Sequence, residues 1–178
     1  MTYNMSPSQQ AVREMAKEFG EKYIAPISAE LDRREEEFPL DLFKKMAQAG
    51  FMAFPMAKEY GGVGKSKIEY VTLIEEISWF DAAAALITAV DNLASYPIET
   101  FGSEVLKKKY LPRMASGEII GAFGLTEPNA GSDAANQQTT AKIDGDHFVI
   151  NGEKIFIMHG DVADLVVLFA KIVAEGEK

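Results

Sequence analysis

The segment from Gly121 to Asp133 carries residue types that could hold a ligand. It begins as a short apolar run, in which Gly121 and Gly124 leave the backbone open to close approach by another group. Thr126 then offers a hydroxyl and an amide, and a Pro-Asn turn leads into a loop that presents the donors of Gly131-Ser132. A flat ring could lie against the run, and a phosphate could accept from the loop. The alternative is a plain surface turn followed by a helix cap.

The whole string resembles the first signature of the acyl-CoA dehydrogenase family: small, aliphatic, Thr, Glu, two variable residues, small, Gly, Ser, Asp. Every one of these types is present up to Asp133. The similarity covers essentially the whole chain, including the Ala25-Pro26 region, Lys58 to Gly62 and Asn151 to Lys154. The resemblance is to the short- and medium-chain members of the family, and it implies an FAD-dependent oxidoreductase of fatty acid β-oxidation.

By this resemblance, the segment from Phe123 to Ser132 binds FAD. The Thr126 hydroxyl and nearby amides would face the pyrimidine edge of the flavin, and Ser132 would lie near the pyrophosphate and the acyl-CoA. Donors at that edge stabilise negative charge on the reduced ring, which favours hydride acceptance. The cofactor residues expected in this segment are Phe123, Gly124, Leu125, Thr126, Gly131 and Ser132.

A second segment, Gly152 to His159, resembles the family's strand that covers one face of the flavin ring. Phe156 takes the aromatic position and is expected to stack on the ring, with Ile157 and Met158 beside it. The alternative is that Phe156 is a core residue. Relatives usually have Thr or Ser at the position of Met158 and Asn at the next, so only the backbone amide remains as a donor to flavin N5. We expect His159 to be solvated; the alternative is that it replaces part of the missing polar contact.

The resemblance also places the acyl chain against the helix from Leu86 to Phe101. Small residues such as Ala89 leave room, whereas Leu93 and Tyr96 limit depth, which predicts a short or medium acyl group. The expected substrate residues are Ser132, Ala89, Leu93 and Tyr96. The alternative is that an Ala-rich buried helix packs tightly against its neighbours and these residues are core.

Members of the family remove a proton alpha to the acyl-CoA thioester while the beta hydrogen passes as hydride to the flavin, which gives a trans-2-enoyl-CoA. The glutamate base belongs to their C-terminal four-helix domain, which we expect beyond Lys178. No catalytic residue is therefore assigned, and the chain alone is expected to be inactive. Glu127 is interpreted as structural. The resemblance further implies an electron-transferring flavoprotein as partner and a homo-oligomeric full-length protein.

Helical patterns occupy the part of the sequence that must position these residues. Capping signals stand at Ser6 with Gln9, at Ser66 with Glu69, and at Asp81 and Ser103. The expected helices run from Pro7 through Phe19 with a bend at Pro26, from Pro39 to Ala49 before Gly50, from Ser66 past Ile77, from Ala82 to Phe101, and from Ser103 to Gly117. The helix from Ala82 is apolar nearly all round, which predicts burial on all sides.

Strand patterns begin after Gly117. Asp144-Gly145 and Asn151-Gly152 are hairpin-turn signals on either side of a strand from His147 to Ile150, and Leu165 to Ile172 reads as one more buried strand. We expect an α+β chain: an N-terminal helical domain at 1–117 and part of an antiparallel β-barrel-like middle domain at 118–178. The few strands predict a truncated sheet, without the family's C-terminal four-helix domain.

Composition excludes several classes of protein. The chain has 178 residues, 47% of them hydrophobic, a net charge of −9, no cysteine and two histidines. A nucleic-acid surface, a disulfide framework and a metal site are therefore not expected. No apolar run reaches membrane-spanning length and the start lacks signal-peptide features, so we expect a cytoplasmic protein.

Two other functions stay open at the level of sequence. A flavin oxidase or monooxygenase of the same fold is suggested only by Met158 and His159. A non-catalytic truncated paralogue, or a helical module that binds a partner, is suggested by the missing base and the incomplete flavin site.

Overall fold

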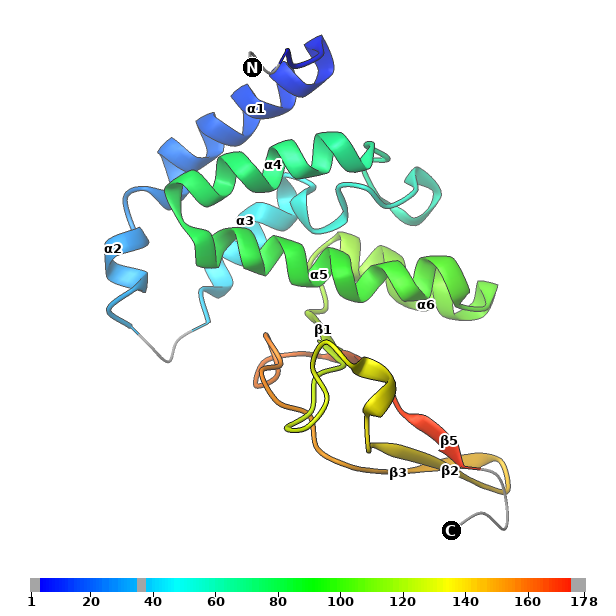
Figure 1. The fold of residues 1–178 in the computed structure, drawn as a ribbon. Helices are drawn as coiled ribbons and strands as arrows, with labels where there is room; N and C mark the ends of the chain where they lie inside the picture. The colour runs from blue at the N-terminus through cyan, green and yellow to red at the C-terminus, as the bar shows by residue number, and fades with distance from the viewer. Residues whose placement is uncertain (1–3, 35–37, 174–178) are drawn as a thin grey trace.

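A computed structural model describes residues 4–34 and 38–173, and its helices and strands occupy separate parts of the molecule (Figure 1). The helices are α1 (Pro7–Phe19), α2 (Ser28–Leu31), α3 (Leu40–Gln48), α4 (Lys67–Phe80), α5 (Ala82–Phe101) and α6 (Glu104–Ala115). A π-helical turn, Gly20–Ile24, continues α1 up to the predicted bend. The strands are β1 (Gly121–Gly124), β2 (Thr140–Asp144), β3 (His147–Asn151), β4 (Leu165–Leu168) and β5 (Lys171–Val173). Among these described residues, no helix is long and apolar enough to cross a membrane.

The predicted capping residues begin the helices. Ser6 and Gln9 form a reciprocal capping box at α1, and the Asp81 carboxylate accepts from the Ala84 amide at 2.9 Å at the start of α5. Ser103 caps α6 by accepting from the Leu106 amide. Each cap satisfies a backbone N–H that has no partner inside its own helix. The sequence signals therefore located these helix starts correctly.

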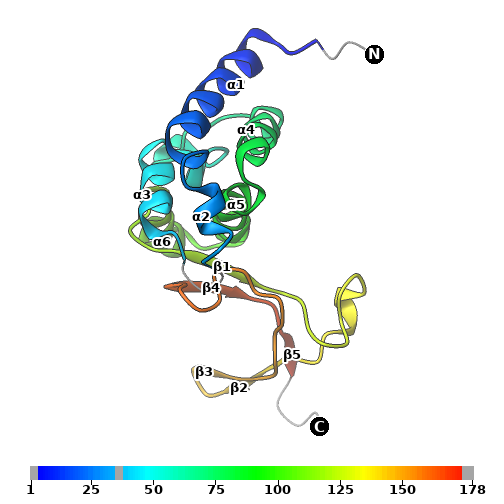
Figure 2. The same cartoon turned by 90° about the vertical axis from the view of Figure 1, so that its left-hand side faces the viewer.

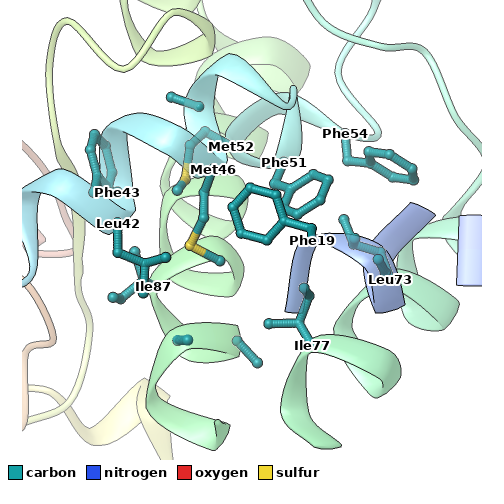
Figure 3. Packing of buried hydrophobic residues seen from close by; sticks show 14 of the residues in the cluster. Phe19, Leu42, Phe43, Met46, Phe51, Met52, Phe54, Leu73, Ile77 and Ile87 are labelled. Atoms are coloured by element: carbon teal, nitrogen blue, oxygen red, sulfur yellow. The ribbon is translucent and has the colours of Figure 1, made fainter. Parts of the chain in front are cut away.

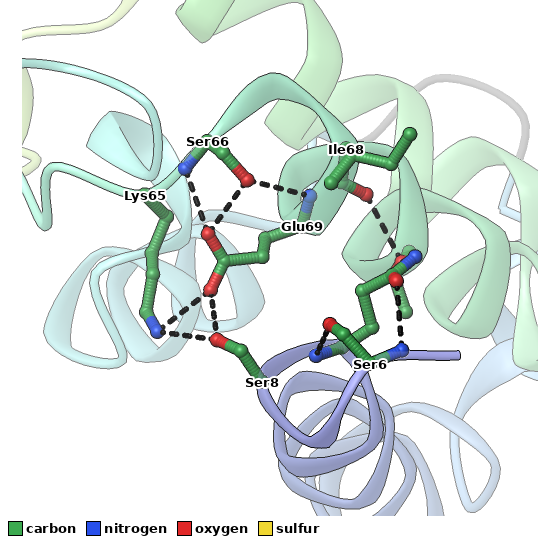
Figure 4. A network of polar contacts seen from close by, with 8 residues as sticks. Ser6, Ser8, Lys65, Ser66, Ile68 and Glu69 are labelled. Carbon is green, nitrogen blue, oxygen red and sulfur yellow. Dashed lines mark hydrogen bonds and ion pairs between the residues drawn. The ribbon is translucent and has the colours of Figure 1, made fainter. Parts of the chain in front are cut away.

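Glu69 links two helices as well as capping one (Figure 4). It accepts from the Ser66 amide at 2.9 Å and from Lys65 Nζ at 2.8 Å, and the Ser8 hydroxyl of α1 donates to it as well. These hydrogen bonds, with that from Lys65 the largest contribution, hold the pKa of Glu69 well below its usual range. A polar contact thus fastens the start of α4 to the start of α1.

The main hydrophobic core lies between α1, α3, α4, α5 and the short 3-10 turn at Phe51–Ala53 (Figure 3). Its fully buried side chains include Phe43, Phe51, Met46 and Leu73. The ring centroids of Phe19 and Phe51 lie 4.8 Å apart, and the two ring planes are tilted relative to each other. Burying each such side chain contributes about 1.5–3 kcal/mol relative to exposure. This packing makes the helical part a rigid support for the strands.

The prediction that α5 is buried on all sides was wrong. Its buried residues recur at helical spacing along one face, as Ala84, Thr88, Asp91 and Ser95 do. Leu86, Leu93 and Tyr96 lie on the other face and are 45%, 47% and 47% exposed. The reason is that α4, α6 and the turn at Phe51–Ala53 all pack on one side of α5.

The strands form two small sheets, with β1 and β4 next to the helices and the β2–β3 hairpin farther away (Figure 2). The antiparallel hairpin of β2 and β3 was predicted correctly, and its turn lies at 145–146. The remaining pairs are parallel: β1 with β4, and β2 with β5. The predicted strand from Leu165 to Ile172 is therefore two strands in different sheets. Among the described residues, the strands form no closed barrel.

Asn151-Gly152 does not form the second hairpin that was predicted. Gly152 has a φ of 156°, and a Cβ there would lie 2.4 Å from Thr139 Oγ1. The glycine is needed because the chain passes closely over Thr139, and the residues after it run as a loop to β4.

Two residues of α4 test this description of the core. Leu73 is fully buried, so Leu73→Ala should lower the free energy of unfolding by about 2–5 kcal/mol through lost burial and a residual cavity. Val71 on the same helix is 60% exposed, and Val71→Ala should change it by less than about 0.5 kcal/mol. Urea denaturation followed by circular dichroism measures both, and equal losses would contradict the assigned burial.

Candidate functional site

The two segments expected to bind the flavin lie against each other at the end of β1. The Ile155 amide donates to the Thr126 carbonyl at 2.9 Å, and Lys154 Nζ donates to the Leu125 carbonyl at 2.9 Å. The loop of residues 152–159 thus runs beside the segment after β1. The fold therefore brings together the two segments that the sequence singled out, and they form one candidate site.

A buried ion pair joins these segments. Lys154 Nζ lies 2.8 Å from Glu127 Oε1, and the two side chains are 8% and 4% exposed. The Glu127 carboxylate also accepts from the amides of Gln138 and Thr139, the latter at 2.9 Å. Lys154 makes a further contact to Gln137 Oε1 at 3.2 Å. A buried pair of charges is tolerated only when hydrogen bonds satisfy both, and this pair meets that condition.

Glu127 is ionised and unsuited to act as a base. Burial by itself would raise its pKa, but the bonds from the Gln138 amide, Lys154 and Thr139 outweigh burial and lower the pKa to about 2. A carboxylate held in this way has little tendency to take up a proton at neutral pH. These bonds assign Glu127 a structural role, as the sequence suggested; the contribution of Lys154 was missed.

Several of the expected cofactor residues keep their donors free. Among the described residues, the hydroxyl and amide of Thr126 and the amides of Gly131 and Ser132 have no hydrogen-bond partner. Gly131 and Ser132 are exposed, Thr126 is half-buried, and a Cβ at Gly131 would meet nothing within 4 Å. Unpaired donors beside open space suit the polar edge and the phosphates of a nucleotide cofactor.

The glycines of β1 have a different use from the one expected. A Cβ on Gly121 would lie 2.7 Å from Met114 Cε, and one on Gly124 would lie 3.1 Å from Leu168 Cδ1. At these two glycines, the atoms that approach β1 closely are side-chain atoms of the protein itself. Phe123 is also engaged within the protein, with its ring centroid 5.1 Å from that of Phe169.

The segment from Gly152 to His159 is a loop and not the predicted strand. The reason is that Lys154 and Ile155 are tied to the Leu125–Glu127 segment, so this stretch does not join a sheet. Phe156 is 91% exposed with a φ of 56°, and its ring face is open. Ile157 is half-buried and Met158 is 40% exposed. The core interpretation of Phe156 was therefore wrong.

His159 is buried, which corrects the expectation of a solvated residue. It is 5% exposed, its Nδ1 lies 2.9 Å from the Gly121 carbonyl, and its ring stands edge-on to Phe38. Burial lowers its pKa, although the bond to Gly121 and the charge of Asp161 oppose that effect. The neutral imidazole is the favoured form.

Asp91 is a buried acid that sequence reasoning missed. It lies fully buried on α5, and its Oδ1 accepts from the Gly121 amide at 2.8 Å. Burial raises its pKa to about 7, against the opposing effect of that bond. An aspartate in the middle of an Ala-rich apolar helix was the signal that could have revealed it.

The expected substrate residues are only partly gathered. Ala89, Leu93 and Tyr96 share the outward face of α5, where Lys67 Nζ lies 4.7 Å from the Tyr96 ring centroid. Ser132 stands apart on the loop after β1. A hollow of about 930 Å³ lies between the α2–α3 region, the first turn of α5 and the Met158–Asp161 segment, and of the expected site residues only Met158 lines it.

Within residues 4–34 and 38–173, no cluster of three or more His, Asp or Glu side chains could hold a metal ion. The site therefore offers hydrogen-bond donors, one open aromatic face and a buried ion pair. These groups can bind and orient a large planar cofactor.

Comparisons with known protein families match both parts of the chain. Residues 6–118 match the family described as "Acyl-CoA dehydrogenase, N-terminal domain", and residues 122–178 match "Acyl-CoA dehydrogenase, middle domain". A short-chain specific acyl-CoA dehydrogenase of Clostridium acetobutylicum is 47% identical over 171 residues, which are 96% of this chain and 45% of that protein. The chain thus spans less than half the length of this curated relative.

Solved structures agree with these matches. A chain from a structure of the electron transferring flavoprotein of Acidaminococcus fermentans superposes with a TM-score of 0.88 at 42% identity, covering 96% of this chain and 45% of that one. A Bacillus anthracis acyl-CoA dehydrogenase complexed with FAD gives a TM-score of 0.86 at 33% identity, covering 95% and 29%.

The ion pair of Glu127 and Lys154 predicts that the free energy of unfolding falls at acid pH. The pKa of Glu127 is about 2 in the folded chain against an ordinary 4.5, so its ionised form stabilises the fold fully above about pH 4.5, and this contribution is lost as pH falls towards 2. Glu127→Gln should lower the free energy of unfolding at pH 7 and flatten its decline between pH 4.5 and 2. Glu118→Gln, at a surface carboxylate, controls for the change in net charge. Parallel wild-type and Glu127→Gln curves in urea titrations would contradict the assignment.

Proposed function

Because this chain belongs to the acyl-CoA dehydrogenase family, we propose that it forms the helical and flavin-binding parts of an FAD-dependent acyl-CoA dehydrogenase. The proposed division is a helical domain at 1–117 and part of the middle β domain at 118–178. One observation carries the proposal: two segments distant in the sequence are joined at Thr126 and Ile155, and near them lie an open aromatic ring and donors that have no partner among the described residues.

The residues present fit FAD. The donors of Thr126 would meet the pyrimidine edge of the flavin, and the amides of Gly131 and Ser132 would meet the pyrophosphate. The exposed ring of Phe156 would stack on the isoalloxazine, beside Ile157 and Met158. FAD, when bound, supplies the hydride acceptor for the reaction. Phe123, Gly124 and Leu125 complete the proposed set as the strand that carries Thr126.

In this proposal the protein's own contribution is orientation and electrostatics. Donors held at the pyrimidine edge stabilise negative charge that develops during reduction, and they cost little reorganisation because the Glu127–Lys154 pair already holds their loop. Met158 offers only its backbone amide near the ring, since a thioether has no N–H or O–H to donate.

The proposed reaction is the α,β-dehydrogenation of an acyl-CoA thioester to a trans-2-enoyl-CoA. The acyl group would lie on the outward face of α5 at Ala89, Leu93 and Tyr96, with Ser132 near the CoA. A short acyl group is favoured because the relative from C. acetobutylicum is short-chain specific. Among the described carboxylates, we assign none as the base; Glu127 and Asp91 are both committed to structural bonds.

The proposal extends to partners. An electron-transferring flavoprotein is the proposed electron acceptor, supported by the superposition on a chain from such a structure. A homo-oligomeric assembly and a cytoplasmic location are further parts of the proposal, and they rest on the family resemblance and the sequence alone. This chain without the rest of such an enzyme is proposed to be inactive.

Flavin binding tests the proposal directly. We expect the purified chain, and the full-length protein that contains it, to retain FAD through gel filtration, with the visible flavin bands in the protein peak. Phe156→Ala should weaken FAD binding by roughly 2- to 10-fold, because a stacked aromatic pair is lost.

A matched control lies on the hairpin. Phe148 is also exposed, at 59%, but stands on β3 away from the junction, so Phe148→Ala should leave FAD binding unchanged. A full-length protein that is folded and holds no flavin, or that does not oxidise butyryl-CoA with a flavoprotein acceptor, would overturn the proposed function.

A further inference from the structure

Gly121, the first residue of β1, is bonded on both sides of its backbone by buried side chains. Its amide donates to Asp91 Oδ1 at 2.8 Å, and its carbonyl lies 2.9 Å from His159 Nδ1. Asp91 is fully buried and His159 is 5% exposed. Neither bond belongs to the ladder that β1 forms with β4, which begins at the pair of Gly121 and Leu165.

The bond to the carbonyl identifies the form of His159. A carbonyl oxygen can only accept, so Nδ1 carries the proton, and in the neutral imidazole Nε2 is then the unprotonated nitrogen. Nε2 has no partner among the described residues. The backbone of His159 has a φ of 63°, which lies in the left-handed region that residues other than glycine rarely adopt. The side-chain bond to Gly121, the contact with Phe38 and the two bonds that the His159 carbonyl accepts from the amides of Val162 and Ala163 hold this strained residue in place.

The bond to the amide joins β1 to the helical layer. Besides Asp91, Met114 and Ala94 crowd Gly121, since a Cβ there would lie 2.7 and 2.9 Å from their side chains. Only glycine lets β1 approach α5 and α6 this closely. Losing the bond would leave a buried N–H and a buried carboxyl without partners, so the two elements are expected to move as one.

The neighbours of Asp91, His159 and Gly121 in the chain connect these two bonds to the proposed site. Asp91 lies on α5 between Ala89 and Leu93, on the face opposite to the proposed acyl contacts. His159 directly follows Met158, and Gly121 opens the strand that leads to Thr126. The backbone of a single residue, Gly121, therefore contacts both the helix that would bind the acyl group and the loop that would bind the flavin.

We propose that Asp91 and His159 are positioning residues that couple the acyl-binding helix α5 to the flavin-binding segments through the backbone N–H and C=O of Gly121. The inference rests on the proposed function for the identity of the two ligands. A displacement of α5 on acyl-CoA binding is passed to β1 and to the 152–159 loop by these two bonds. In this proposal acyl-CoA strengthens the binding of FAD, and because coupling between two ligands is reciprocal, FAD strengthens the binding of acyl-CoA by the same factor.

Asn92, the neighbour of Asp91 in the chain, provides a matched control variant. It donates to the carbonyls of Phe51 and Thr88, both at 2.8 Å, and has no bond to β1 among the described residues. Asp91→Ala should therefore remove the side-chain hydrogen bond from α5 to β1, whereas Asn92→Ala perturbs the same helix and leaves that bond in place. Asp91→Asn keeps an acceptor for Gly121 and should behave as the wild type.

The first readout needs no flavin. Hydrogen exchange of the Gly121 amide should accelerate by roughly 3- to 10-fold in Asp91→Ala and stay at the wild-type rate in Asp91→Asn and Asn92→Ala. His159→Leu, which removes the donor to the carbonyl, provides a second variant if Asp91→Ala does not fold, and His159→Asn restores a donor. An unchanged Gly121 rate in a folded Asp91→Ala protein would overturn the proposal.

The second readout is the coupling itself in the full-length protein. FAD affinity is measured with and without a non-oxidisable thioether analogue of butyryl-CoA. We expect the analogue to strengthen FAD binding by roughly 5-fold or more in the wild type and in Asn92→Ala, and to have no effect in Asp91→Ala and His159→Leu. Full coupling in both of those variants would overturn the inference and leave the proposed function standing. Loss of FAD binding from the wild type would instead refute the proposed function.

Discussion

The buried pair of Glu127 and Lys154 is the interaction on which the candidate site depends. One carboxylate accepts from an ammonium and two backbone amides, and these partners come from the loop before β2 and from the 152–159 loop. Charges in a low-dielectric interior are stable only with a complete set of hydrogen bonds, so these segments have little freedom to separate. The open donors of Thr126 and the exposed ring of Phe156 keep their places because this pair holds the loops beneath them.

The helical part supplies the second constraint. Its core of Phe43, Phe51, Met46 and Leu73 fixes α5, and α5 in turn holds β1 through Asp91. The small β region contains few buried apolar side chains of its own, and the β2–β3 hairpin is largely exposed. Its β1 and β4 strands are positioned on the helices by packing, in which Leu165 and Val167 contact the cluster of Ala94, Met114 and Ile119, and by the bond between Gly121 and Asp91.

Two neighbouring residues of the candidate site, Met158 and His159, depart from the pattern that the family resemblance implies. Met158 lacks a side-chain donor next to the proposed flavin ring, while the next residue, His159, turns inward to the Gly121 carbonyl. His159 thus does not replace the missing donor. Its role is to fix the end of the loop on which Phe156 and Met158 stand, and the cost is a backbone in the left-handed region.

The sequence by itself determined the helices, their caps, the change to strands after Gly117 and the two segments that lie together at the candidate site. These are local properties: a serine three residues before a glutamate or glutamine, ahead of a helical apolar pattern, favours a helix start through contacts within one turn, and the Thr-Glu to Gly-Ser-Asp string is contiguous. Only the tertiary structure decided which strands pair in parallel, which face of α5 stays open, and that His159 and Asp91 are buried around Gly121. Those outcomes depend on contacts between residues 30 or more positions apart, and no local pattern of residue types encodes which distant backbone group a buried side chain will find.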